Sequence, residues 1–433
     1  MATPIVVRYG NIQEAFEQNP GDVLQAINDG ATSAAGGDTQ QGTAMVAAWN
    51  NAVAELAKDD KGAGLMSSPR DDLASRIQTS IAQHAVEQAK LQQVQPSTVI
   101  STPGGDFEAP EIVEVKFSNA DLIGWIGMSW KLIFKPERHP WINPPVEPEK
   151  LANDAIIALF GDWATGLYGA PVISQHVAKL DRCDVVLHLG DTYYSGGDDE
   201  VVRRLVDDWP KRDGKSVNRT LNGNHEMYSG GHGYFTALQN FFNQQASCFA
   251  MQNDNWLIIG LDTAYVDSDL AGTQVDWLNS MVAAAGTRKL ILFSHHQPFS
   301  QLDSQGPQLQ QKLHDLLNKQ RIYAWFWGHE HRLVLYEPHS QWGFKGRCVG
   351  HGGFPAFRDN LPGAGGKIYQ WIRLTAQPHV PAARLLDGPN FWVTQDPEGY
   401  NPNGYAVLEF AGPKCFETYR TADGIAVTGR VEL

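Results

Sequence analysis

The 433-residue sequence contains little cysteine and no long apolar run. Its 4 cysteines, Cys183, Cys248, Cys348 and Cys415, lie far apart without any paired spacing, so neither a zinc ribbon nor a disulfide framework is indicated. No run approaches the roughly 18 consecutive apolar residues that a membrane-spanning helix needs. The N-terminus also lacks the basic start and apolar stretch of a secretory signal. We therefore expect a cytoplasmic protein without a membrane partner, unless a leader has been removed.

Positive charge is also scarce, since 48 acidic residues outnumber 34 basic ones and give a formal net charge of -14. Such a surface repels a polyanionic duplex, so bulk nucleic acid is not an expected partner. A small phosphorylated substrate is compatible with this charge, because a bound metal pair can reverse the local field.

The N-terminal hundred residues contain few aromatic side chains and have a helical pattern. The clearest helix begins at Ser68, a suitable N-cap, with Pro69 at the first helical position. Apolar residues then form one stripe at i+4 spacing: Leu73, Ile77, Ile81 and Ala85. We expect residues 1–104 to form a helical accessory segment and residues 105–433 to form the main domain. The stripe is interpreted as core packing; the alternative is a homo-oligomer that forms through these helices.

From residue 155 onward, short apolar runs of strand length alternate with helical stretches. The predicted strands are 155–160, 185–189, 256–261, 290–294 and 323–327. The predicted helices are 171–180, 201–209, 273–285 and 308–320. After residue 334 the pattern becomes β-rich, with predicted strands at 405–410, 415–421 and 425–431. The alternation predicts a layered α/β domain, in which ligands gather beyond the carboxyl ends of the strands.

Polar or ionisable residues follow most of these strand runs. The clusters are Gly161-Asp162, Gly190-Asp191-Thr192-Tyr193-Tyr194, Gly223-Asn224-His225-Glu226, Ser294-His295-His296 and Gly328-His329-Glu330-His331. Where a glycine is present it lets the backbone turn sharply, so that the next side chain points into a common space. Aspartate, asparagine, histidine and tyrosine together form a mixed oxygen and nitrogen set that suits a pair of transition-metal ions. Any one cluster is weak evidence, but all five together are hard to explain by packing.

The series resembles the calcineurin-like metallophosphoesterases, and more closely their purple acid phosphatase branch, over about residues 155–335. The broad family begins with Asp-x-His, whereas Asp162 is followed by Trp163 and Ala164. Purple acid phosphatases also lack that histidine and have a tyrosine three residues after the second aspartate, where Tyr194 stands. The resemblance implies a four-layer αββα double β-sandwich for the catalytic domain.

The same resemblance implies a ligand set for two metal ions. Asp162, Tyr194 and His331 would hold a ferric ion, and Asp191 would bridge it to a second ion, such as Fe(II), Zn or Mn. Asn224, His329 and one histidine of the 295/296 pair would hold this second, divalent ion, and His295 is preferred because it is nearer the strand end. Tyr193 competes with Tyr194; if Tyr194 pointed into the core, two divalent ions would be expected.

The expected activity is hydrolysis of phosphomonoesters by a hydroxide that the metal pair generates. His225 and His296 would face the phosphate, where a histidine can donate to its oxygens or to the leaving group. His232 and His351 lie in glycine-rich loops and are further candidates for the pocket wall. The alternatives are a phosphodiesterase with the same metal centre and a non-catalytic binding or regulatory protein that retains the fold.

Overall fold

The computed structural model describes residues 138–433 apart from 194, 213, 359–360, 362 and 394–396, together with the backbone of residues 98–102 and 105–109. The predicted helices before residue 98 lie outside the described residues. Strands β1 (Thr98–Thr102) and β2 (Gly105–Ala109) pair antiparallel, so the predicted boundary between residues 104 and 105 falls within a strand pair. The division into an accessory segment and a catalytic domain stays a prediction.

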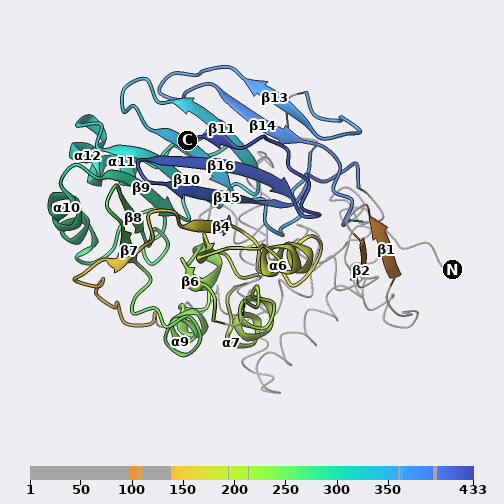
Figure 1. Ribbon diagram of the computed structural model, residues 1–433, viewed down its shortest axis with the longest axis horizontal. Helices are drawn as coiled ribbons and strands as arrows, with labels where there is room; N and C mark the ends of the chain where they lie inside the picture. The colour runs from red at the N-terminus through yellow and green to blue at the C-terminus, as the bar shows by residue number, and fades with distance from the viewer. Residues whose placement is uncertain are drawn as a thin grey trace, which may run out of the picture.

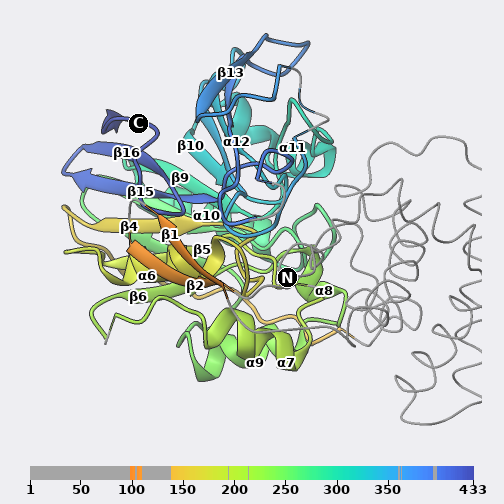
Figure 2. The ribbon, with the colours of Figure 1, turned by 90° about the vertical axis from the view of Figure 1, so that its right-hand side faces the viewer.

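Two large sheets form the centre of the described part of the chain (Figures 1 and 2). The larger sheet has the strand order β13-β14-β11-β12-β10-β9-β8-β7-β3, and the smaller one has the order β17-β16-β15-β4-β5-β6. The larger sheet contains β3 (Glu149–Lys150), β7 (Phe249–Gln252), β8 (Trp256–Gly260), β9 (Lys289–Ser294), β10 (Ile322–Trp327), β11 (Leu333–Pro338), β12 (Lys345–Val349), β13 (Gln370–Leu374) and β14 (Ala383–Asp387). The smaller sheet contains β4 (Ile156–Phe160), β5 (Val185–His188), β6 (Val217–Thr220), β15 (Gly404–Ala411), β16 (Lys414–Thr421) and β17 (Val431–Glu432).

Helices cover the outer face of each sheet (Figure 1). The smaller sheet packs against α6 (Ala170–Ala178), α9 (His232–Asn240) and the segment formed by α7 (Asp198–Glu200) and the π-helical η1 (Val201–Val206). The larger sheet packs against α10 (Gln274–Ala285), α11 (Pro307–Lys312) and α12 (His314–Asn318). The short α8 (Asn224–Met227) follows β6. The arrangement is the expected four-layer αββα sandwich.

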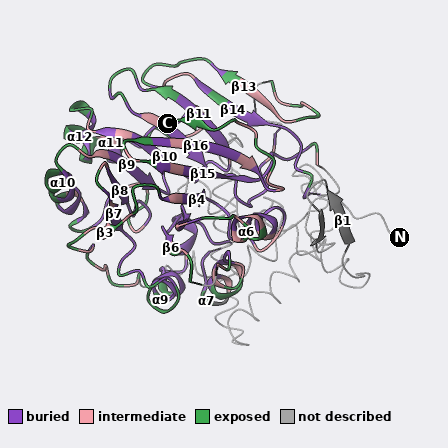
Figure 3. Ribbon diagram, viewed as in Figure 1, coloured by how far each residue is buried: buried purple, intermediate pink, exposed green. Residues whose placement is uncertain are grey.

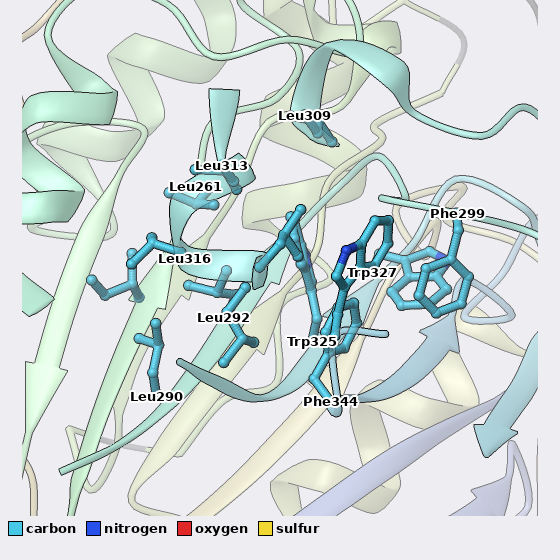
Figure 4. Packing of buried hydrophobic residues seen from close by; sticks show 14 of the residues in the cluster. Leu261, Leu290, Leu292, Phe299, Leu309, Leu313, Leu316, Trp325, Trp327 and Phe344 are labelled. Carbon is cyan, nitrogen blue, oxygen red and sulfur yellow. The ribbon is translucent and has the colours of Figure 1, made fainter. Parts of the chain in front are cut away.

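Alternating side chains of the central strands separate three apolar layers. In β9, Leu290 and Leu292 pack toward the helices, whereas Ile291 and Phe293 pack between the two sheets. The helix-side layer joins leucines of α11 and α12 to Trp325 and other side chains of the larger sheet (Figure 4). Figure 3 shows that the strands are mostly buried and that exposed residues lie on the outer helices and loops. Each fully buried leucine or phenylalanine contributes about 1.5–3 kcal/mol, so the layers are held mainly by apolar burial.

The predicted strands and helices match most of the observed ones, with two corrections. The predicted helix 308–320 is broken at Leu313 into α11 and α12. The predicted strand 425–431 is wrong as a continuous strand, because only Val431–Glu432 forms a strand against β16, while Ala426 makes an isolated bridge to Arg420. The side chains of Ile425 and Val431 are 45% and 50% exposed, so pairing there would bury little apolar surface. Among the described residues, no helix has the length and apolar character needed to cross a bilayer.

Candidate metal centre

The candidate site lies where parallel strands of both sheets end. β4, β5 and β6 run parallel in the smaller sheet, and β8, β9 and β10 run parallel in the larger one. Backbone hydrogen bonds join the two edges: the Gly161 N–H donates to the Val349 carbonyl, and the Gly352 N–H donates to the Gly161 carbonyl. The side chains predicted from the strand ends therefore share one space between the sheets.

Three predicted ligands of the divalent ion converge on one point. Asn224 Oδ1 lies 3.0 Å from His295 Nε2 and 3.1 Å from His329 Nδ1, and the two ring nitrogens are 3.2 Å apart. The other ring nitrogen of His295, Nδ1, is 3.0 Å from the Leu189 carbonyl oxygen. Because a carbonyl can only accept, that Nδ1 carries the proton and Nε2 presents its lone pair to the cluster. A divalent ion bound by nitrogen and amide oxygen fits these three donors.

A second group of donors surrounds the hydroxyl of Tyr193. This oxygen lies 2.9 Å from His331 Nε2, 3.3 Å from Asp162 Oδ1 and 3.2 Å from Asp191 Oδ2. Tyr194, the tyrosine that the family resemblance favours, lies outside the described residues. Within the described part of the chain, Tyr193 is therefore the phenol that faces the two predicted carboxylate ligands.

Asp191 connects the two donor groups. Its Oδ2 is the oxygen near Tyr193, and its Oδ1 lies 3.4 Å from His295 Nε2. One carboxylate thus offers one oxygen to each group, which is the geometry of a bridging ligand between two ions. Asp162, Asp191 and His295 also offer donor atoms within 4.8 Å of one another.

Strained backbone is concentrated in this site. Nine described residues other than glycine have positive φ, and four of them are Asp162 (55°), Asp191 (77°), His329 (67°) and His331 (52°). Such conformations cost about 1–3 kcal/mol each and persist only where the surroundings impose them. The backbone of Gly223 lies so close to the Asp191 carboxylate that a Cβ at this position would meet Oδ1 at 2.0 Å. The fold accepts these costs at the residues that carry the donor atoms.

The buried carboxyl groups of Asp162 and Asp191 have no lysine or arginine among the described residues as an ion-pair partner. Their ion pairs are with histidines. Burial raises the pKa of Asp162 to about 7, and burial together with the charge of Asp162 raises the pKa of Asp191 well above its ordinary value. Burial likewise raises the pKa of the Tyr193 phenol and lowers the pKa of His295. Bound cations would reverse the upward pKa shifts of the carboxyl and phenol groups and reinforce the downward shift of the imidazole, because they stabilise the deprotonated ligands. Donor chemistry and charge together fit a pair of metal ions.

The two histidines predicted to face the substrate lie beside the donor groups. His225 Nε2 is 3.7 Å from Asp191 Oδ2, and its ring centroid is 4.5 Å from that of Tyr193. His296 Nδ1 lies 3.1 Å from the Thr263 hydroxyl, whereas its Nε2 has no hydrogen-bond partner among the described residues. His295, His296 and His329 offer nitrogens within 4.8 Å of one another. Of residues 295 and 296, His295 contacts Asn224, with Nε2 3.0 Å from Oδ1, and this contact favours His295 as the ligand.

The other two loop histidines have neighbours outside this cluster. His232 is exposed at the start of α9, and its ring packs edge-on against His139 with centroids 5.6 Å apart. His351 is buried beside the start of β15, where a Cβ on Gly404 would meet its Nε2 at 2.7 Å. Burial lowers the pKa of His351 to about 3, so it is a neutral packed side chain.

Two acidic residues were not predicted as part of the site. Glu226 Oε2 accepts from the backbone N–H groups of Gly223 and Asp191, at 2.7 and 3.2 Å, and so joins the loops that carry the asparagine and aspartate ligands. An acid three residues after a helix start is the sequence signal for this role. Asp303 Oδ2 lies 3.8 Å from His329 Nε2. Its loop carries no comparable sequence signal.

Residues 156–333 match the family model described as calcineurin-like phosphoesterase. This part of the chain belongs to that family. The match covers every candidate ligand described above.

Several solved structures are similar to this chain. A purple acid phosphatase from yellow lupin (Lupinus luteus) is 16% identical, with 65% of this chain and 53% of that chain covered and a TM-score of 0.45. GAP50 of Plasmodium, described as the anchor in the inner membrane complex, is 12% identical over 65% and 89%, with a TM-score of 0.47. Vps29 from Cryptosporidium parvum is 12% identical over 65% and 98%, with a TM-score of 0.32. The aligned part thus spans about half of the lupin enzyme. No curated protein sequence matches the chain.

Proposed function

We propose that this phosphoesterase hydrolyses small phosphomonoesters at a binuclear centre of the purple acid phosphatase type. The observation that carries the proposal is the position of Asp191, whose two oxygens face two separate donor groups. Tyr193 and His331 belong to the group expected to hold Fe(III), because phenolate and carboxylate oxygens favour a trivalent ion. The group of Asn224 and the two histidines is expected to hold Fe(II), Zn or Mn.

The bound ions would acidify a water molecule and neutralise the oxygens of the phosphoryl group. The protein's own residues would donate hydrogen bonds and protons. His225 is placed to donate to a phosphate oxygen or to the leaving group, and His296 Nε2, which makes no hydrogen bond to the described residues, is a second donor. A monoester dianion has three non-bridging oxygens, so two imidazole donors beside the metal pair suit a monoester better than a diester.

Activity is tested with p-nitrophenyl phosphate and its bis-ester on protein loaded with iron and zinc. Faster hydrolysis of the monoester is expected, and loss of both metals should abolish it. A clear preference for the bis-ester would assign a phosphodiesterase. Two bound metals without hydrolysis of either ester would favour a binding or regulatory protein that keeps the fold.

The iron is tested by the visible spectrum of the iron-loaded protein. A phenolate ligand gives a charge-transfer band, and Tyr193→Phe is expected to remove this band while Tyr194→Phe retains it. The hydroxyl of Tyr193 supports this expectation, because it lies within 3.3 Å of Asp162 and His331. Loss of the band in Tyr194→Phe alone would return the ligand role to Tyr194. A colourless protein that holds only zinc or manganese would instead indicate two divalent ions.

A further inference from the structure

Asp303 places an unpartnered carboxylate oxygen beside a candidate metal ligand. Its side chain is 7% exposed, and Oδ2 lies 3.8 Å from His329 Nε2. Within the part of the chain that the structure describes, this oxygen has no hydrogen-bond partner, whereas Oδ1 accepts from the Ser304 N–H. Burial of a carboxylate oxygen without a partner is costly, so its position requires an explanation.

A set of hydrogen bonds fixes the loop that carries Asp303. The backbone N–H of Asp303 donates to the Ser300 hydroxyl at 2.9 Å, and this hydroxyl donates to Glu330 Oε2 at 2.6 Å. Glu330 Oε1 in turn accepts from the Trp327 indole at 2.6 Å. Glu330 directly follows His329 in the sequence. The loop after β9 is therefore tied to the same turn that presents His329.

The orientation of the His329 ring decides which nitrogen can bind a metal. Nδ1 faces Asn224 and His295, so binding through Nδ1 requires the proton on Nε2, the nitrogen nearest Asp303. Ligating histidines commonly donate their second ring N–H to a carboxylate, which fixes the ring and strengthens the ligand. At 3.8 Å the pair exceeds hydrogen-bond distance, so the ring must move roughly 0.6 Å or more toward Asp303 on binding.

We infer that Asp303 is a positioning residue that holds His329 for the divalent ion by accepting from its Nε2–H. The inference rests on the proposed binuclear centre. It places Asp303, in the loop after β9, behind the second metal site, where it acts through His329 and does not contact the phosphate.

The test is calorimetric titration of Zn²⁺ into metal-stripped full-length protein. In Asp303→Asn the amide oxygen accepts the hydrogen bond from the Ser304 N–H. The amide NH₂ group then faces the His329 Nε2–H, and because both groups are donors, they form no hydrogen bond. We expect one of the two Zn²⁺ affinities to fall about 10- to 100-fold while the other is unchanged. Asp303→Glu should recover part of the loss. The melting temperature of the stripped variant should equal or exceed that of the stripped wild type, because an unpartnered buried charge is removed.

Asp267→Asn is the matched comparison, because Asp267 makes the corresponding contact with His296, at 3.6 Å. It should bind Zn²⁺ as the wild type does. Wild-type Zn²⁺ affinities in Asp303→Asn would overturn the inference. Equal weakening of Zn²⁺ binding at both sites together with a lower melting temperature would also overturn it, because that result indicates a structural role. Weakening in Asp267→Asn alone would make His296 the ligand and also overturn it. Wild type that binds two Zn²⁺ but hydrolyses neither ester overturns only the proposed function.

Discussion

Substitution of Gly223 by alanine is the sharpest steric test of the bridging carboxylate. The added Cβ would lie 2.0 Å from Asp191 Oδ1, 2.7 Å from its Cγ and 2.8 Å from its backbone nitrogen. Real Cβ atoms keep at least 3.0 Å from such neighbours, so the carboxylate must move by about 1 Å. Asp191 Oδ1 also accepts from the His225 N–H at 3.1 Å and faces His295. The movement therefore pulls the bridging oxygen out of both contacts.

The expected loss follows from that displacement. A misplacement of 1 Å at a reacting centre can cost about 100-fold in rate, and overpacking costs about 1–3 kcal/mol of stability. We expect Gly223→Ala to lose at least about 100-fold in kcat/KM for p-nitrophenyl phosphate. It should also bind less of the second metal by elemental analysis.

Gly429→Ala is the control, because a Cβ there meets nothing within 4 Å. The control should keep wild-type activity, metal content and melting temperature. Gly223→Ala protein with two bound metals and activity within threefold of wild type would refute the assignment of Asp191 as the bridging ligand.

Two further predictions separate ligand from donor and test the contact between the sheets. Asn224→Ala should lower the occupancy of one metal, whereas His225→Ala should slow turnover with both metals retained. Elemental analysis together with steady-state rates measures both effects. The opposite pattern would refute the assignment of Asn224 as a metal ligand and of His225 as a donor to the phosphate. Burial opposes ionisation of Glu417, but Arg347, 2.8 Å away across the sheets, outweighs it and lowers the pKa of Glu417 below 4.5. The stabilisation is therefore present above pH 4.5 and lost as pH falls through the lowered folded value. Glu417→Gln should cost about 3–5 kcal/mol in urea unfolding at pH 7 and less in acid, and a pH-independent difference would contradict the argument.

The layered fold was predictable because local pattern and burial agree along the central strands. β9 has a continuous apolar run that is buried on both faces, and this is the sequence signature of a parallel strand between two layers. β6 was missed because its residues Val-Asn-Arg-Thr have no apolar run. Its place depends on pairing with β5 and on the contact of Arg219 with Glu149. Such tertiary contacts leave no local pattern to read.

The donor residues were predictable for a similar reason, since parallel strands of known order bring their carboxyl ends together. Spacing alone did not decide between Tyr193 and Tyr194, because a turn after a strand can direct either neighbour inward. The Tyr193 hydroxyl lies beside Asp162 and Asp191, whereas Tyr194 lies outside the described residues. Asp303 lay beyond sequence reasoning because it reaches His329 from a different loop, and only the folded path of residues 300–303 brings it there.

Strain and charge in the site have the same physical explanation. Asp162, Asp191, His329 and His331 hold positive φ, and the two aspartates are buried without a described lysine or arginine as partner. Each feature raises the free energy of the folded chain, and neither improves the packing of the apolar layers. Cations bound between these donors would offset both costs, because they bind the folded arrangement and not the unfolded chain. The positions where the fold is least favourable by itself are therefore the ones that carry the candidate metal donors.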